Sequence, residues 1–302
     1  MSKTRRQRNV RTISKKRGGK SSSTSLLHIH THVIGLDKYF STLLQPKVAT
    51  MITEDDFYVN SAMRNIYMQV EPEGIHPHEK QIIEKAAEYT YILTYNENIL
   101  KQCLNAYKYI YGTTTISPDQ YNSIDVKNKV FRITSITGNK SGLPGYKFRH
   151  DSYSSQNQIT SIPTRFFISS RAGHTIIPKK NRNTPHLNKN SKINVFVDSQ
   201  FSLVIENSKQ ANYFTEKLCD CLITKTIPVY WGCPNISEYF DTTGWILLED
   251  ESVENLAKKL NALTPEYYMK YTDTIEKNFK EVKNYTDIVE NINKALRKIP
   301  DY

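Results

Sequence analysis

The sequence lacks any apolar run long enough to cross a membrane, and no hydrophobic signal core follows its basic N-terminus. A membrane-spanning helix needs about 20 consecutive apolar residues, and a secretory signal needs an apolar core of its own. We therefore predict a soluble intracellular protein, cytoplasmic or in a comparable compartment, with neither a signal peptide nor a transmembrane anchor.

Cysteine is also scarce, with four residues among 302. Cys103, Cys219, Cys221 and Cys233 match no spacing that is typical of a disulfide framework or a zinc site. Cys219 and Cys221 are two residues apart on an expected helix, so their side chains point to different faces. Free thiols are the expectation, which argues against the class of small disulfide-rich secreted domains.

Acidic residues are absent before Asp37, whereas nine lysines and arginines lie within the first 20 positions. Subtracting these nine charges from the net charge of +11 leaves +2, so the rest of the chain is nearly neutral. Residues 1–25 cannot bury apolar surface, and we predict a disordered basic tail there. Contact with nucleic acid, contact with an anionic membrane surface and a targeting role all suit such a tail, and these alternatives stay open.

Residues 26–118 have the alternating pattern of an α/β domain. The runs Ile66–Val70 and Thr90–Tyr95 predict strands, and the helical spacing over Glu79–Tyr89 predicts a helix between them. A further helix is expected over Ile99–Tyr107. Strands that alternate with helices predict a parallel sheet.

A second α/β domain is expected over residues 119–264, followed by helices over 265–302. Val130–Ser135 and Phe166–Ser170 predict its first strands, and the stretch Asn181–Lys192, rich in Asn and Lys, is interpreted as a surface loop. The chain is therefore predicted to have two consecutive domains of the same class.

Two polar clusters in the first domain need an interpretation. His28, His30 and His32 share one face of an expected strand, where they either bind a metal or form a polar strand face. Glu54–Asp55–Asp56 is interpreted as a solvated acidic turn. We assign no metal site to either cluster.

The most informative segment is residues 201–232. The apolar runs Phe201–Ile205 and Ile227–Trp231 predict two strands, and between them a helix begins after Thr215, a residue suited to cap it. In such a βαβ unit, ligands bind beyond the carboxyl ends of the strands, where the free N–H groups of the helix start attract anions. A lysine and a glutamate in the first helical turn offer a phosphate contact and a hydroxyl acceptor. The segment therefore predicts a pocket for a nucleotide diphosphate.

These residues resemble the donor-binding motif of the α-1,3/1,4-fucosyltransferase family, glycosyltransferase family 10. The resemblance rests on Ile205–Ser208, Tyr213–Lys217 and Ile227–Gly232, and it continues through Gly244–Leu248 to Glu249–Asp250. It implies two Rossmann-like domains of the GT-B type that face each other across a cleft, with C-terminal helices. Because we expect no membrane anchor, the sequence is most similar in this respect to the soluble bacterial and viral members of the family.

Transfer of a sugar from a nucleotide diphosphate requires positive charge on the departing diphosphate. The sequence has no Asp-x-Asp pair to hold a metal, so we predict no cofactor and a metal-independent reaction. Lys217 is the first candidate cation because of its position at the helix start. By resemblance, Arg149, which enters an earlier helix, contacts the diphosphate as well, and Arg171 competes for that role.

The resemblance also implies roles for polar residues around the motif. Glu216 accepts from hydroxyl groups of the ribose or of the donor sugar, and Asn207 and Tyr213 line the same pocket. Glu206 is expected to make hydrogen bonds at the strand end rather than to act in catalysis.

Deprotonation of the acceptor hydroxyl requires a general base, and the resemblance implies a glutamate of the first domain, just after a strand. Glu71 is the best counterpart, and Glu73 is the alternative. A carboxylate that is half-buried at a strand end can have its pKa raised toward neutrality, as a base requires.

The sequence thus predicts an inverting glycosyltransferase, an α-1,3-fucosyltransferase that moves fucose from GDP-fucose to a hydroxyl of a glycan acceptor. One alternative is a transferase with another nucleotide-sugar donor. A second is a catalytically decayed fold that acts as a binding or scaffold protein through its basic tail. The intact set of Asn207, Tyr213, Glu216 and Lys217 argues against decay.

Overall fold

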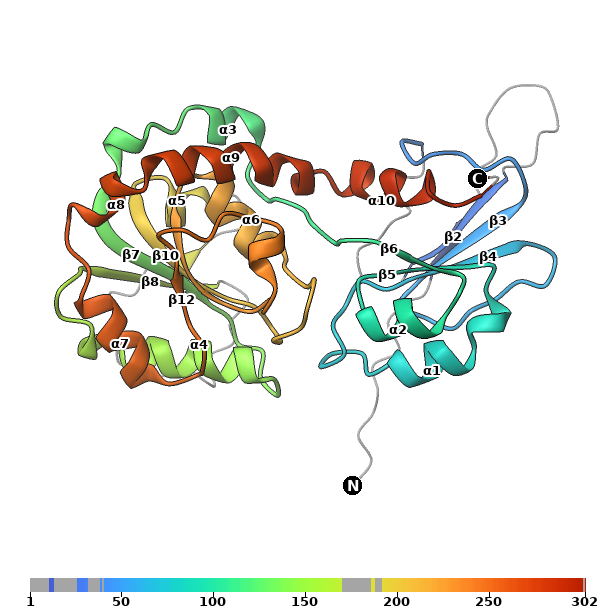
Figure 1. Cartoon of the computed structure of the whole chain (residues 1–302), viewed down its shortest axis with the longest axis horizontal. Helices are drawn as coiled ribbons and strands as arrows, with labels where there is room; N and C mark the ends of the chain where they lie inside the picture. The colour runs from blue at the N-terminus through green and yellow to red at the C-terminus, as the bar shows by residue number, and fades with distance from the viewer. Residues whose placement is uncertain are drawn as a thin grey trace. The chain divides into compact units, whose positions relative to one another are not determined.

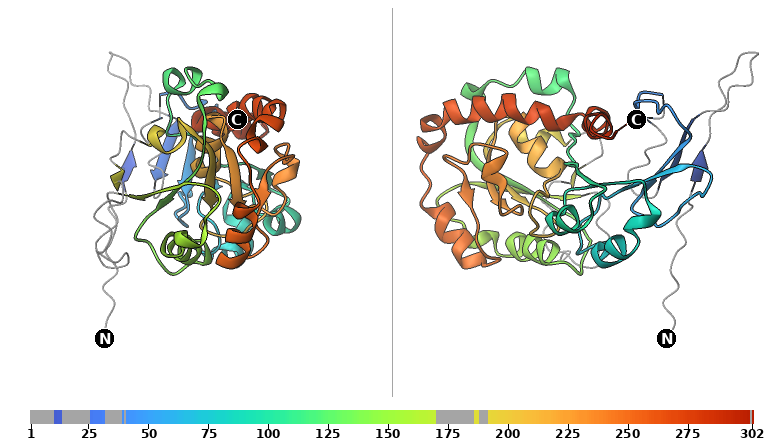
Figure 2. Two further views of the ribbon diagram at one scale, coloured as in Figure 1. Left: turned by 90° about the vertical axis from the view of Figure 1, so that its left-hand side faces the viewer. Right: turned by 45° about the vertical axis from the view of Figure 1, so that its right-hand side comes forward.

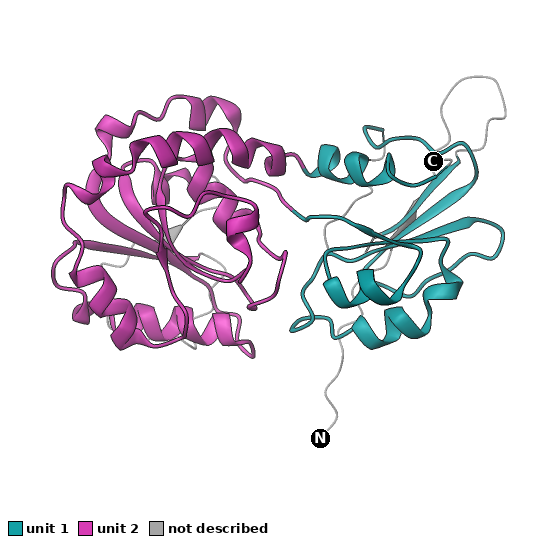
Figure 3. Cartoon of the chain, viewed as in Figure 1, with its two compact units in different colours: residues 1–111, 288–302 teal, residues 112–287 magenta. Residues whose placement is uncertain are grey.

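The computed structural model describes residues 26–31, 39, 41–169, 192–300 and 302, together with the backbone of 11–13 and 186–187. The chain forms two compact units, coloured separately in Figure 3. Unit 1 comprises Met1–Tyr111 and Ile288–Tyr302, and unit 2 comprises Gly112–Asp287. The end of the chain therefore returns to unit 1, and the segment 265–302, for which helices are predicted, is divided between the two units.

The predicted basic tail lies outside the described residues, except for a short strand, β1 (Arg11–Ile13), which pairs antiparallel with β2 (Leu27–Thr31). Within the ranges that the structure describes, none of the helices combines the length and the apolar character that a membrane crossing requires.

Unit 1 contains a six-stranded sheet in the order β1-β2-β3-β4-β5-β6. All neighbours after the first pair are parallel. The parallel strands are β2 (Leu27–Thr31), β3 (Thr50–Glu54), β4 (Arg64–Met68), β5 (Tyr91–Thr94) and β6 (Ala106–Lys108).

The two faces of this sheet pack against different helices (Figure 1). Ile66 and Met68 of β4 join the core cluster that contains Ile292 of helix α10 (Ile288–Leu296). Tyr67, which points to the other face, packs with residues of α1 (Glu79–Glu84) and α2 (Glu97–Gln102). Successive strand residues point to opposite faces, so helix α10, supplied by the last residues of the chain, completes the layer that α1 and α2 leave uncovered.

The helix expected over Ile99–Tyr107 is wrong in its second half. Helix α2 ends at Gln102, and Tyr107 lies in β6, paired with Leu93 of β5. The amide of Asn105 donates to the carbonyl oxygens of Ala86 and Tyr89, which holds the chain in a turn at this point. Pairing with a neighbouring strand therefore prevails over the helical spacing of the apolar residues.

Unit 2 contains a second six-stranded sheet, entirely parallel, in the order β12-β11-β10-β7-β8-β9. Counted from β7, this is the 3-2-1-4-5-6 order of a Rossmann fold, with its switch point between β7 and β10. The predicted α/β class is confirmed in both units. The strands are β7 (Val130–Thr137), β8 (Thr164–Ser169), β9 (His186–Leu187), β10 (Ser199–Ile205), β11 (Ile227–Trp231) and β12 (Ile246–Leu247).

Helices cover both faces of this sheet (Figures 1 and 2). Helix α4 (Pro144–Ser154) packs against α7 (Val253–Asn261), and α6 (Glu216–Ile223) packs against α9 (Thr272–Thr286). The remaining helices are α3 (Pro118–Asn122), α5 (Ile193–Phe196) and α8 (Tyr267–Lys270). Helices on both faces explain why β10 is buried along its whole length, including its polar residues Ser199, Gln200 and Ser202.

Lys129, directly before β7, is a buried lysine whose amine donates to the carbonyl oxygen of Phe196 (2.6 Å) and the hydroxyl of Thr226 (2.8 Å). Burial lowers the pKa of Lys129 to about 7. In the unfolded chain, the amine of Lys129 stays protonated up to roughly pH 10. Between about pH 7 and pH 10, the unfolded state therefore binds more protons than the folded state, and the free energy of unfolding rises with pH.

We expect the contribution of Lys129 to the free energy of unfolding to grow by about 3 kcal/mol between pH 7 and 9.5. This increase should be absent in Lys129→Met. Urea unfolding of both proteins at the two pH values measures it. Lys80→Met, which alters a lysine side chain that is 89% exposed, is the control and keeps the native dependence. An equal dependence in Lys129→Met and the native chain would contradict the prediction.

Candidate active site

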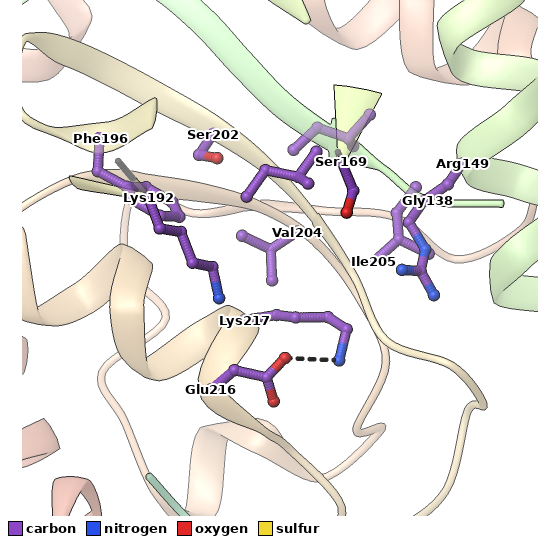
Figure 4. A pocket seen from close by; sticks show the side chains of 12 residues that line it. Gly138, Arg149, Ser169, Lys192, Phe196, Ser202, Val204, Ile205, Glu216 and Lys217 are labelled. Carbon is purple, nitrogen blue, oxygen red and sulfur yellow. Dashed lines mark hydrogen bonds and ion pairs between the residues drawn. The ribbon is translucent and has the colours of Figure 1, made fainter. Parts of the chain in front are cut away.

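A cavity of about 210 Å³ lies in unit 2 at the carboxyl ends of β7 and β10, the switch point of the sheet (Figure 4). Strand β10 forms its floor, and the starts of α5 and α6 contribute charged side chains. Its lining consists of Ile136, Gly138, Arg149, Ser169, Lys192, Phe196, Ser202, Leu203, Val204, Ile205, Glu216 and Lys217.

The turn from β10 into α6 is fixed by Glu206, whose side chain is fully buried. Its two carboxylate oxygens accept from the backbone N–H (2.9 Å) and the hydroxyl (2.8 Å) of Thr215. Thr215 in turn caps α6 by accepting from the N–H of Lys217. The predicted strand-end hydrogen bonding of Glu206 and the predicted Thr215 cap are confirmed, and this turn sets the start of α6 beside the end of β10.

Lys217 and Glu216 form the charged start of α6. The Lys217 amine lies 3.2 Å from a Glu216 oxygen and 3.5 Å from Glu206, and it donates to the Thr215 hydroxyl at 3.0 Å. Burial opposes ionisation of Glu216, but the charges of Lys217 and Lys192 outweigh it and lower the pKa of Glu216 to about 2. Glu216 is therefore a carboxylate at neutral pH, able only to accept hydrogen bonds.

Arg149 reaches the cavity from the second turn of α4. A side chain at Gly145 would collide with the carbonyl oxygen of Glu206, at 1.9 Å from its Cβ, so glycine lets α4 approach the end of β10. Arg149 then donates through Nη2 to Asn207 (2.7 Å) and through Nε to the Gly145 carbonyl (3.1 Å). Burial lowers the pKa of Arg149, yet a guanidinium stays charged in proteins.

Asn207 and Tyr213 do not belong to the described lining of the cavity. Asn207 is connected to it through its hydrogen bond to Arg149, and Tyr213 is buried, with 3% of its surface exposed. The structure thus brings Arg149, Glu216 and Lys217 together in one cavity. Arg171, the competing arginine, lies outside the described residues.

Two further charged residues of this site were not predicted. Lys192 lines the cavity, and its amine lies 2.6 Å from a carboxylate oxygen of Asp220, which is fully buried in α6. Lys192 was counted in a predicted surface loop, most of which lies outside the described residues. A carboxylate inside the apolar run of α6 was the signal in the sequence that could have identified Asp220, because buried charges require partners.

In unit 1, Glu71 and Glu73 follow β4, as expected for residues after a strand. Glu73 accepts from the amide of Gln69 and from the backbone N–H of Glu79, both at 3.0 Å. Burial raises the pKa of Glu73, which the two hydrogen bonds counteract in part. Both glutamates are partly exposed.

The interpretation of Glu54–Asp56 as a solvated turn is wrong for its first two residues. Glu54 and Asp55 are buried, and Asp55 has a positive φ of 47°. The carboxylate of Asp55 accepts from the N–H groups of Val70 (3.0 Å) and Glu71 (2.7 Å). Burial away from water raises the pKa of Asp55 well above its usual value. Asp55 therefore fixes the backbone that carries Glu71.

His28, His30 and His32, which share one face of the expected strand, do not form a metal site within the described part of the chain. His30 pairs with Asp56 at 3.0 Å and stacks on Tyr58, whereas His32 lies outside the described residues. Among the described residues, no group of three His, Cys, Asp or Glu side chains is arranged to hold a metal ion.

Comparison with known proteins agrees with the sequence motif. Residues 173–296 match the model of glycosyltransferase family 10 (fucosyltransferase), C-terminal part. A 69-residue stretch is 33% identical to the α-(1,3)-fucosyltransferase FucT of Helicobacter pylori, which is 23% of this chain and 14% of that protein. The family resemblance predicted from the sequence is confirmed.

Solved structures share the fold at low sequence identity. Anabaena Alr3699/HepE, in complex with UDP-glucose, has a TM-score of 0.55 at 8% identity, over 82% of this chain and 78% of that one. Staphylococcus aureus TarM has a TM-score of 0.53 at 13% identity, over 87% of this chain and 57% of that one. These similarities identify a two-sheet α/β architecture shared with GT-B glycosyltransferases.

Proposed function

Residues 173–296 belong to glycosyltransferase family 10, and from this premise we propose that the chain is an inverting glycosyltransferase of the α-1,3-fucosyltransferase kind. Its donor is GDP-fucose, and its acceptor is a hydroxyl group of a glycan. The proposal follows from the family and from the chemistry of the cavity in unit 2.

One observation carries the proposal: Arg149 and Lys217 line the same cavity at the switch point of a Rossmann-type sheet. Nucleotides bind at this point in doubly wound α/β proteins. A guanidinium suits a two-point grip on phosphate oxygens, and an ammonium in the first turn of α6 adds its charge to that of the helix start. Together they can balance the charge of a departing diphosphate.

The reaction is a single displacement. The carboxylate of Glu71 takes the proton of the acceptor hydroxyl, and the acceptor oxygen forms a bond to the anomeric carbon of the donor sugar. The bond between that carbon and the diphosphate oxygen breaks, and its electron pair leaves with the diphosphate. Attack opposite the leaving group inverts the configuration of the carbon, while Arg149 and Lys217 stabilise the leaving group.

Glu216 binds the donor on its hydroxyl side. Its carboxylate accepts hydrogen bonds from the ribose or from the sugar, because its low pKa keeps it ionised. Asn207 holds Arg149 in place, and Tyr213 is buried in the loop that leads to α6.

Thermal unfolding in the presence of GDP-fucose, GDP-mannose and UDP-glucose tests the donor. At about 100 times its Kd, the correct donor adds roughly 2.7 kcal/mol to stability, a rise in Tm of about 5 °C. We expect this rise with GDP-fucose and its absence in Lys217→Ala, while Lys277→Met, an exposed lysine paired with Asp241, retains it. Stabilisation by UDP-glucose alone would exclude the GDP-sugar assignment.

Mass spectrometry of glycan acceptors after incubation with the stabilising donor then measures transfer itself. We expect transfer to persist in EDTA, because side chains of the protein balance the charge of the leaving group. Loss of turnover on chelation and its return with Mn²⁺ would contradict that part of the mechanism.

A further inference from the structure

Lys192 occupies a place in the donor cavity that the proposed reaction does not use. It lies just before α5, its side chain is 20% exposed, and it lines the cavity together with Glu216 and Lys217. Figure 4 shows the Lys192 side chain directed toward the side of the cavity that carries Glu216.

The position of the Lys192 amine is fixed by Asp220. One carboxylate oxygen of Asp220 accepts from the Thr114 hydroxyl (2.6 Å) and the Thr115 N–H (2.8 Å). The other accepts from the Thr115 hydroxyl (2.7 Å) and lies 2.6 Å from the Lys192 amine. Both oxygens are thus fully engaged, and the buried Asp220 anchors Lys192.

Lys217, by contrast, is shared among several partners. Its amine contacts Glu216, Glu206 and Thr215. A phosphate group that binds at the start of α6 competes for the same amine, because an ammonium has only three donors. With Lys217 turned to the phosphate, Lys192 and Arg149 are the described cations that line the cavity together with Glu216, and Lys192 is the one directed toward the Glu216 side (Figure 4).

We propose that Lys192, anchored by Asp220, is the permanent counter-ion of Glu216 and positions its carboxylate to accept the ribose hydroxyls of a nucleoside diphosphate. This inference rests on the proposed function, because it assigns Glu216 to the nucleotide of the donor. Lys192 is a positioning residue: it acts through Glu216, and the ligand groups that respond to it are the ribose hydroxyls. The electrostatic influence of Lys192 on Glu216 supports the assignment.

A thermodynamic cycle distinguishes the positioning of Glu216 by Lys192 from two alternatives, a direct contact of Lys192 with phosphate and a purely structural role of Lys192. Calorimetry measures the binding of GDP and of 2′,3′-dideoxy-GDP to the native chain, Lys192→Met and Lys192→Arg. The pair UDP and 2′,3′-dideoxy-UDP is measured in parallel, so that the result is independent of the base. Lys277→Met is the control for the loss of a lysine outside the cavity.

We expect Lys192→Met to weaken the binding of the ribonucleotide about tenfold, with less than about a twofold change for the dideoxy ligand. Lys192→Arg, which keeps the charge, restores most of the difference. Equal weakening of both ligands would overturn the inference and leave the proposed function standing. Binding of neither GDP nor UDP to the native chain would overturn the proposed function and the inference with it.

Discussion

An Arg149→Ala variant is expected to transfer sugar about 10²–10³ times more slowly than the native chain, the usual cost of removing a preorganised charge from a developing anion. Arg149 is held by Asn207 and by the Gly145 carbonyl. In the proposed reaction, we therefore expect its charge to be in place when negative charge develops on the leaving diphosphate. The measurement is kcat at saturating donor and acceptor.

Two variants show whether the shape or only the charge of Arg149 matters. Arg149→Lys keeps a cation but loses the planar fork that can bind two phosphate oxygens, so most of the defect should remain. Arg165→Ala removes an arginine that pairs with Asp198 at 3.7 Å and lies outside the described lining of the cavity. We expect Arg165→Ala to keep the native kcat. A native kcat in Arg149→Ala would show that Lys217 is sufficient, or that the undescribed Arg171 carries the role.

The sequence was sufficient to predict the turn from β10 into α6, because the interactions in that turn are local. Glu206, Thr215 and Lys217 lie within 12 positions of one another, and their contacts need only a strand, a turn and a helix start. The apolar runs on either side predict these elements through their length and composition. Arg149 required the family resemblance, because it reaches the cavity only through the packing of α4 against β10.

Lys192 and Asp220 could not be predicted in the same way. Lys192 precedes β10 in the sequence and Asp220 follows it, so their ion pair bridges a whole strand. The other partners of Asp220, Thr114 and Thr115, lie more than 100 positions before it. A lysine in a polar stretch carries no signal of such a contact. Charge composition identifies a tail or a surface, whereas a buried ion pair depends on the tertiary structure.

Unit 1 was predicted less well for a related reason. The helical spacing from Ile99 to Tyr107 is real, but Tyr107 pairs with β5 because a parallel strand there completes the sheet. The buried Asp55 was mistaken for a solvated residue since its partners are backbone N–H groups, which no sequence pattern reveals. The packing of α10 in unit 1 is a contact between the two ends of the chain, and it too leaves no local signal.

Removal of the general base has the largest expected effect, and it distinguishes the two candidate glutamates of unit 1. Glu71→Gln is expected to lower kcat by about 10²–10⁴, because glutamine cannot accept the proton of the acceptor hydroxyl. Glu73→Gln is expected to cost less than about tenfold. The hydrogen bonds of Glu73 to Gln69 and to the Glu79 backbone fix the loop, and the carbonyl oxygen of a glutamine preserves part of that bonding.

The pH dependence of kcat/KM supplies the second criterion. Deprotonation of the base produces the acidic limb of the profile. Burial raises the pKa of Glu73, so Glu73 is an alternative candidate for the general base. If Glu71 is the base, the acidic limb survives in Glu73→Gln and is lost from the residual activity of Glu71→Gln. The reverse pattern would transfer the role to Glu73, and unchanged kcat in both variants would exclude this loop as the source of the base. Binding of the donor nucleotide in unit 2 should be unaffected by either change, so calorimetry with GDP confirms that a loss of activity comes from proton transfer.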